Sequence, residues 1–208
     1  ADERGLLGQR EIQWILEGDG AEGDGERRGG GLIVHAEAEA VDQIELRLVV
    51  AVAYDGLCTF EFGVAAEMFA LPRPEMGADW YRFAVAGIDA GEMRAMGGVR
   101  IVADGGPDLI GESGTVIVPG WRGVECPVPP LLIEALRKAN ERGARILSIC
   151  SGVFVLAAAG LLSGKKATTH WRYSERLREM YPDITVVPDV LYIDEGNPTD
   201  AGFAATLR

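Results

Sequence analysis

The stretch from Arg145 to Tyr173 constrains the fold most, because a strand-like run, a small-residue turn and a helix-like run follow one another without a gap. Residues 146–149 are a short apolar run of a length that suits a buried strand. Residues 150–152 (C-S-G) follow, and residues 153–159 (V-F-V-L-A-A-A) are typical of a buried helix. This is the layout of a nucleophile elbow, in which a reactive side chain, here Cys150, sits on a sharp bend above the sheet edge.

The elbow also has an electrostatic consequence for Cys150. A thiol at the start of a helix faces unpaired N–H groups and the positive end of the helix dipole, which favour a thiolate. We therefore expect the pKa of Cys150 to lie below the ~8.5 of a free thiol. The alternative is that Cys150 is one more small buried hydrophobic residue, as most free cysteines are.

Strand-like and helix-like runs alternate along most of the chain, which predicts an α/β fold with a mainly parallel sheet and helices on both faces. We expect strands at 46–54, 81–86, 115–118, 146–149, 184–187 and 190–193. We expect a short hairpin or edge piece at 97–103 and helices at 59–71, 130–142, 153–159 and 171–181. A last helix could begin at 201–207, although it is too short to cover a sheet face well.

Residues 1–45 differ in composition from the rest and are expected to be a disordered extension to a domain of residues 46–208. Residues 1–47 hold 12 acidic and 5 basic residues, and seven of the fourteen residues from Gly18 to Gly31 are glycine. Such a segment loses much entropy on ordering and has little apolar surface to bury.

The overall composition excludes several classes of protein. A formal net charge of −12 argues against direct nucleic-acid binding, because phosphate contacts need clustered Lys and Arg. No apolar run approaches the ~20 residues that span a bilayer, and the charged first residues do not resemble a signal peptide. Three cysteines without metal-site spacing are expected to be reduced thiols in the cytoplasm. We expect no cofactor and no metal, since there is no Walker loop, no G-x-G-x-x-G after a strand and no H-E-x-x-H.

Three loops should meet where ligands bind in a doubly wound sheet, beyond the carboxyl ends of the strands. The first loop contains Glu61, which stands between two phenylalanines and could stay protonated and hydrogen-bond to a thiolate. The alternative for Glu61 is a solvated residue in a first helical turn, favoured by the helix dipole. The second loop is 119–123 (P-G-W-R-G), and the elbow is the third. Backbone N–H groups of the 119–123 loop and of Ser151 could form an oxyanion hole or a carboxylate cradle, although a Pro-Gly pair is also an ordinary turn.

Other candidates carry weaker signals. His170 could be a base, an acid or a ligand contact, or a structural histidine. Trp121 and Trp171 could line a pocket, or belong to the core. Asp194 is a weak candidate for a third catalytic residue.

Several motifs together resemble the PfpI/ThiJ superfamily, whose fold is like that of class I glutamine amidotransferases. They are Y-D-G at 54–56, E-x-x-x-x-x-E-x-F at 61–69, V-P-G at 118–120, I-C-S-G at 149–152 and L-A-A-A-G-L-L-S-G-K-K-A-T-T-H-W at 156–171. The last run resembles the branch that holds the N-terminal domains of AraC-type (FtrA/GlxA-like) transcriptional regulators and the isocyanide hydratases. The resemblance covers about 150 residues, and it implies a flavodoxin-like three-layer sandwich.

The resemblance implies roles for individual residues. Cys150 matches the elbow cysteine, and Glu61 matches the acid that hydrogen-bonds to it. Trp121 and Ser151 match positions whose backbone N–H groups form an anion site. Gly120, directly before Trp121, is expected to contact the ligand as well. The chain departs from the protease-like branch because Ser151 stands where that branch has a histidine. Compared with the regulators, the chain is expected to stop near the end of the first domain and to lack a helix-turn-helix element. Its last residues match the closing helix of the family only loosely.

Three functions remain open at this stage. The first is the ligand-sensing, homodimerising domain of an AraC-type regulator, with a small molecule bound among Glu61, Trp121, Cys150, Ser151 and His170. The second is an enzyme in which the Cys150 thiolate attacks an isocyanide or a reactive aldehyde. That branch usually has an aspartate where Glu61 stands. The third is an inactive fragment.

Overall fold

The computed structural model describes residues 47–77, 80–194 and 203–205. The expectation of a disordered segment at 1–45 lies outside these residues. No helix in the described part of the chain is long and apolar enough to cross a membrane.

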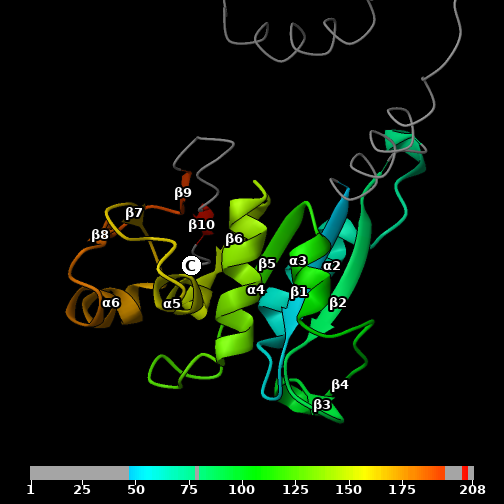
Figure 1. The fold of residues 1–208 in the computed structure, drawn as a ribbon, viewed down its shortest axis with the longest axis horizontal. Coiled ribbons are helices and arrows are strands. Elements are labelled where there is room, and N and C mark those ends of the chain that lie inside the picture. Colours follow the sequence, from blue (N-terminus) through cyan, green and yellow to red (C-terminus); the bar gives the residue numbers. More distant parts are fainter. Residues whose placement is uncertain (1–46, 78–79, 195–202, 206–208) are drawn as a thin grey trace, which may run out of the picture. The chain divides into compact units, whose positions relative to one another are not determined.

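A six-stranded sheet forms the centre, in the order β2-β1-β5-β6-β10-β9 (Figure 1). Its strands are β1 Leu48–Ala53, β2 Arg82–Gly87, β5 Thr115–Pro119, β6 Arg145–Ile149, β9 Tyr192–Asp194 and β10 Phe203–Ala205. All neighbours pair in parallel except β10 and β9. The expected α/β class and the mainly parallel sheet are therefore confirmed.

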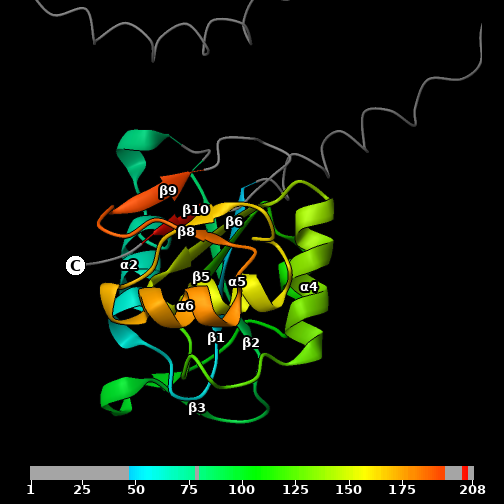
Figure 2. The same ribbon diagram turned by 90° about the vertical axis from the view of Figure 1, so that its left-hand side faces the viewer.

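Helices cover both faces of the sheet (Figure 2). Helix α2 (Thr59–Phe69) packs on the face that carries Val49, Ala51, Ile117 and Ile149. The opposite face is covered by α3 (Asp108–Glu112), α4 (Pro130–Glu141) and α5 (Val153–Ala158). The strands β1 and β5 are buried on both faces, which explains why their sequences are apolar without alternation.

Shorter elements complete the described chain. They are the turns η2 Pro74–Met76, η3 Met96–Gly98, η4 Cys150–Gly152 and η5 Trp171–Tyr173, the helix α6 Ser174–Met180, and the strand pairs β3 Met93–Arg94 with β4 Arg100–Ile101 and β7 Lys166–Ala167 with β8 Thr185–Val186. The β3–β4 pair is antiparallel, so a hairpin is present, but it begins at Met93, before the expected range 97–103.

Two expectations about the last third of the chain need correction. The expected helix at 171–181 begins as a 3₁₀ turn, and its α-helical part starts only at Ser174. The expected last helix at 201–207 is wrong at Phe203–Ala205, which form strand β10 between β6 and β9. Local composition could not reveal this strand, because it lies between β9 and β6, and β6 comes from a distant part of the chain.

Candidate functional site

The elbow is a strained turn at the carboxyl end of β6. Cys150 has a φ of 56°, in the left-handed region that residues with a Cβ rarely adopt. The chain then passes through η4 into α5. Gly152 is required here, because a Cβ at this position would lie 2.3 Å from the carbonyl oxygen of Val118 on the neighbouring strand. The elbow is thus pressed against the end of β5.

Ser151 ties the elbow to the loop after β5. Its buried hydroxyl accepts a hydrogen bond from the backbone N–H of Trp121, at 2.9 Å, and donates one to the carbonyl oxygen of the same residue, at 3.3 Å. The N–H of Trp121 therefore has the Ser151 hydroxyl as a partner, and the expectation that it forms an anion site with the N–H of Ser151 stays a prediction. The N–H of Ser151 lowers the pKa of the Cys150 thiol.

Glu61 lies in the first turn of α2, and its carboxyl acts on the thiol of Cys150. Burial, followed by the negative charge of Glu61, raises the pKa of Cys150 to about 11. The N–H of Ser151 acts in the opposite direction but is the smaller effect. The expectation of a pKa below ~8.5 is therefore wrong, because loss of hydration and an adjacent carboxyl outweigh the start of a short helix.

A second thiol, Cys58, belongs to the same site. It is the residue before α2, and its sulfur packs so closely on Gly120 that a Cβ there would lie 2.6 Å from it. The hydroxyl of Tyr54 contacts this sulfur at 3.7 Å and donates to the carbonyl oxygen of Pro119 at 3.0 Å. Burial raises the pKa of the Cys58 thiol, and Glu61 raises it further. Sequence reasoning missed Cys58, although it lies in the loop that was expected to meet Cys150.

These groups open into one cavity of about 560 Å³. Glu61, Trp121, Cys150 and Ser151, four of the six residues expected at the site, line it. The other residues of its wall are Cys58, Thr59, Phe60, Met96, Gly97, Arg122, Gly123, Val124 and Tyr173. Phe60 and Met96 are 67% and 56% exposed, so the wall includes apolar side chains that reach into solvent.

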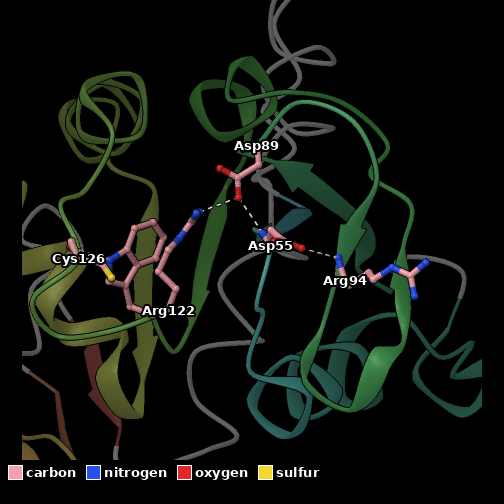
Figure 3. Close-up of polar contacts among 6 residues, drawn as sticks. Asp55, Asp89, Arg94, Arg122 and Cys126 are labelled. Carbon is pink, nitrogen blue, oxygen red and sulfur yellow. Dashed lines mark hydrogen bonds and ion pairs between the residues drawn. The ribbon is translucent and has the colours of Figure 1, made fainter.

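A polar network holds the loops that form the cavity (Figure 3). The Arg122 guanidinium pairs with Asp89 at 2.7 Å, and the same Asp89 oxygen accepts the backbone N–H of Asp55. Arg122 also lies over the rings of Tyr54 and Trp121, at 5.3 and 4.8 Å from their centroids. The ion pair is partly exposed, so its main effect is to fix the loop after β5 against the loops after β1 and β2. Sequence reasoning did not find this network.

Gly120 and His170, the other two of the six expected residues, do not line this cavity, and neither does Asp194. The Nδ1 atom of His170 accepts the backbone N–H of Arg172 at 3.3 Å, so the side chain caps η5. Its ring packs near Trp171 and Tyr173. This favours the structural alternative for His170. Trp171 is 66% exposed, and Asp194 lies at the end of the edge strand β9.

Comparisons with known proteins agree with this geometry. Residues 47–201 match the model of the DJ-1/PfpI family. An uncharacterised protein of the cpoL 5′ region of Streptomyces lividans is 35% identical over 135 residues, which cover 64% of this chain and 94% of that protein. The transcriptional regulator CdhR of Pseudomonas aeruginosa, of the HTH type, is 34% identical over 131 residues, covering 62% of this chain and 39% of the regulator.

An isonitrile hydratase of Pseudomonas putida is 37% identical over 101 residues, covering 44% of this chain and 42% of the hydratase. The chain thus spans about two fifths of the length of the regulator and of the hydratase. Among solved structures, DJ-1beta of Drosophila melanogaster has a TM-score of 0.62 at 21% identity and covers 77% of this chain and 81% of that one. An AraC family transcriptional regulator from Pseudomonas putida has a TM-score of 0.60 at 19% identity and covers 76% of this chain and 82% of that one. At these identities the two structures show a shared fold.

Proposed function

Because the chain belongs to the DJ-1/PfpI family, we propose that residues 46–208 are the ligand-sensing and dimerising domain of an AraC-type transcriptional regulator. The regulator CdhR aligns with this chain over about two fifths of its length, which leaves room in that protein for a separate DNA-binding part. In this proposal a small molecule binds the cavity, and binding shifts the equilibrium of a homodimer joined to such a part. The site lies in the cytoplasm and needs no cofactor.

The setting of Cys150 is the observation that carries this proposal, because its thiol is half-buried and faces the influence of the Glu61 carboxyl. Burial and Glu61 raise the pKa of the thiol to about 11. A cysteine nucleophile reacts as its thiolate. A neutral thiol in such a setting is better suited to contact a ligand than to attack one.

The cavity wall indicates the chemistry of the ligand. A volume of about 560 Å³ is in the range of small-molecule sites. Glu61 offers a carboxyl to a cationic or hydrogen-bond-donating group, while Trp121, Tyr173 and Met96 offer apolar and aromatic surface. A small polar molecule with an amine or hydroxyl group and a short apolar body would satisfy both.

Thermal unfolding of the 208-residue chain with a panel of small amines, amino acids and hydroxy acids tests the proposal. A ligand present at 100 times its Kd stabilises the folded state by about 2.7 kcal/mol, so it raises the melting temperature. We expect at least one such compound to act on the wild type and to lose its effect in Glu61→Gln. If the wild type turns over an alkyl isocyanide or methylglyoxal and Cys150→Ala does not, the sensor proposal is wrong.

A second candidate is an isocyanide hydratase, favoured by the carboxyl of Glu61 acting on the Cys150 thiol. In this candidate Glu61 takes the thiol proton while the sulfur attacks the isocyanide carbon, and the proton then passes to that carbon to give a thioimidate. Water adds to the thioimidate, which collapses to an N-substituted formamide and regenerates the thiol. Because the reacting form is the thiol beside its base Glu61, the rate should stay level above neutral pH and change only near pH 11, where the thiol ionises.

A further inference from the structure

A buried threonine reaches the elbow from a distant part of the chain. The hydroxyl of Thr169 donates a hydrogen bond to the carbonyl oxygen of Cys150 at 2.9 Å, across 19 residues of sequence. Thr169 is 3% exposed and lies in the loop between β7 and η5. None of the roles described so far uses this residue.

The bond acts on the most strained point of the site. Cys150 has a φ of 56°, a conformation that costs a residue with a Cβ about 1–2 kcal/mol. Such a residue relaxes to an ordinary conformation unless its surroundings hold it. The bond to its carbonyl oxygen is one of the interactions that hold it.

The planarity of the peptide bond carries the effect from the oxygen to the sulfur. The carbonyl of Cys150 and the N–H of Ser151 belong to one rigid plane and point in opposite directions. When Thr169 fixes the carbonyl, it therefore also fixes the N–H of Ser151, which lowers the pKa of the Cys150 thiol.

We propose that Thr169 is a positioning residue of the elbow, which orients the Cys150–Ser151 peptide and so keeps the sulfur half-buried against Glu61. Two titratable groups act on Cys150 in this arrangement. They are Glu61 on α2 and Cys58, which is the residue before that helix. Arg122 also lines the cavity, but its guanidinium is paired with Asp89. This role of Thr169 does not depend on the sensor function, so its failure would leave that function untouched.

The direction of the expected effect follows from the order of the influences on Cys150. Burial and Glu61 raise the pKa of the thiol by more than the Ser151 N–H lowers it. If the elbow relaxes and the sulfur leaves this position, all three influences weaken together. The pKa should then fall from about 11 toward the ordinary value of 9.0.

The experiment measures the alkylation rate of Cys150 by iodoacetamide against pH. The tryptic peptide that contains Cys150 carries no other cysteine, so mass spectrometry follows it separately from Cys58 and Cys126. Thr169→Val keeps the shape of the side chain and removes the hydroxyl, and Thr169→Ser keeps the hydroxyl. Thr168→Val is the matched control, because Thr168 is an equally buried neighbour on the same segment.

We expect Thr169→Val to react with iodoacetamide at least about threefold faster at pH 8 than the wild type, which corresponds to a midpoint lower by about 0.5 pH unit. Thr169→Ser and Thr168→Val should keep the wild-type profile, and the rate of Cys126 should stay constant in all variants. If Thr169→Val does not fold, Thr169→Ala compared with Thr169→Ser takes its place. A wild-type profile in the folded variant without the hydroxyl, or an equal change in Thr168→Val, would overturn the inference.

Discussion

Replacing Glu61 by glutamine tests the electrostatics of the site directly. The substitution keeps the size of the side chain and removes its negative charge, which is one of the causes of the raised pKa of Cys150. Two unit charges about 4 Å apart interact by about 1 kcal/mol in water and about 4 kcal/mol near a protein surface. For a half-buried thiol a value of about 1.4 kcal/mol is reasonable, which is about one pKa unit.

The expected midpoint for Glu61→Gln is therefore about 10, compared with about 11 in the wild type. At pH 8 the ionised fraction of the thiol should rise from about one in 1000 to about one in 100, and the iodoacetamide rate of Cys150 should rise about tenfold. Glu67→Gln is the matched control, because Glu67 is an exposed acid on the same helix. Its profile should superimpose on that of the wild type.

Two results would refute this reasoning. A midpoint that does not move in Glu61→Gln would mean that the carboxyl does not act on the sulfur. A wild-type midpoint below ~8.5 would mean that the turn activates the thiol after all, and the case for an enzyme would then be stronger than the case for a sensor.

Three further predictions concern the stability of the fold, measured by urea unfolding. Between pH 9 and 11 the folded chain retains the Cys150 proton that the unfolded chain releases, so stability should fall as pH rises through this range, by about 1–2 kcal/mol, and Cys150→Ser should flatten the fall. Gly152→Ala should cost about 3 kcal/mol or more, since its Cβ would clash with a backbone oxygen. Gly63→Ala, in the open middle of α2, should instead stabilise by about 0.5–1 kcal/mol, and a similar loss in both would exclude the steric argument. Ser151→Ala should cost about 1–3 kcal/mol by leaving the N–H and carbonyl of Trp121 without their partner, whereas an unchanged midpoint would show that water replaces the hydroxyl.

The fold could be predicted largely from the sequence, because its main signals are local. Doubly buried strands such as β1 and β5 are apolar at every position, and Pro130 and Gly143 mark the ends of α4. The short strand β10 could not be recognised, because only its pairing with β6 and β9 makes it a strand.

The candidate site was predicted in part for the same reason. The elbow has a local pattern, and the resemblance supplied Glu61 as its partner. The pairing of Arg122 with Asp89 and the bond from Thr169 to Cys150 join residues 33 and 19 positions apart, so no short window contains them. Whether the pKa of the Cys150 thiol is raised or lowered depends on how deeply its sulfur is buried, which is a property of the packed fold.

The position of β1 has a kinetic consequence. Five of the six residues of this strand are buried, yet its partners β2 and β5 begin 34 and 67 residues further along the chain. Closing loops of that size costs about 3–4 kcal/mol of entropy before any pairing can compensate. Refolding should therefore be slow, on the scale of milliseconds to seconds, and the apolar segment Val49–Ala53 stays unprotected until both partners arrive. Refolding at high dilution is then expected to recover more folded chain than refolding at high concentration, because two unpaired copies of this segment can meet and aggregate.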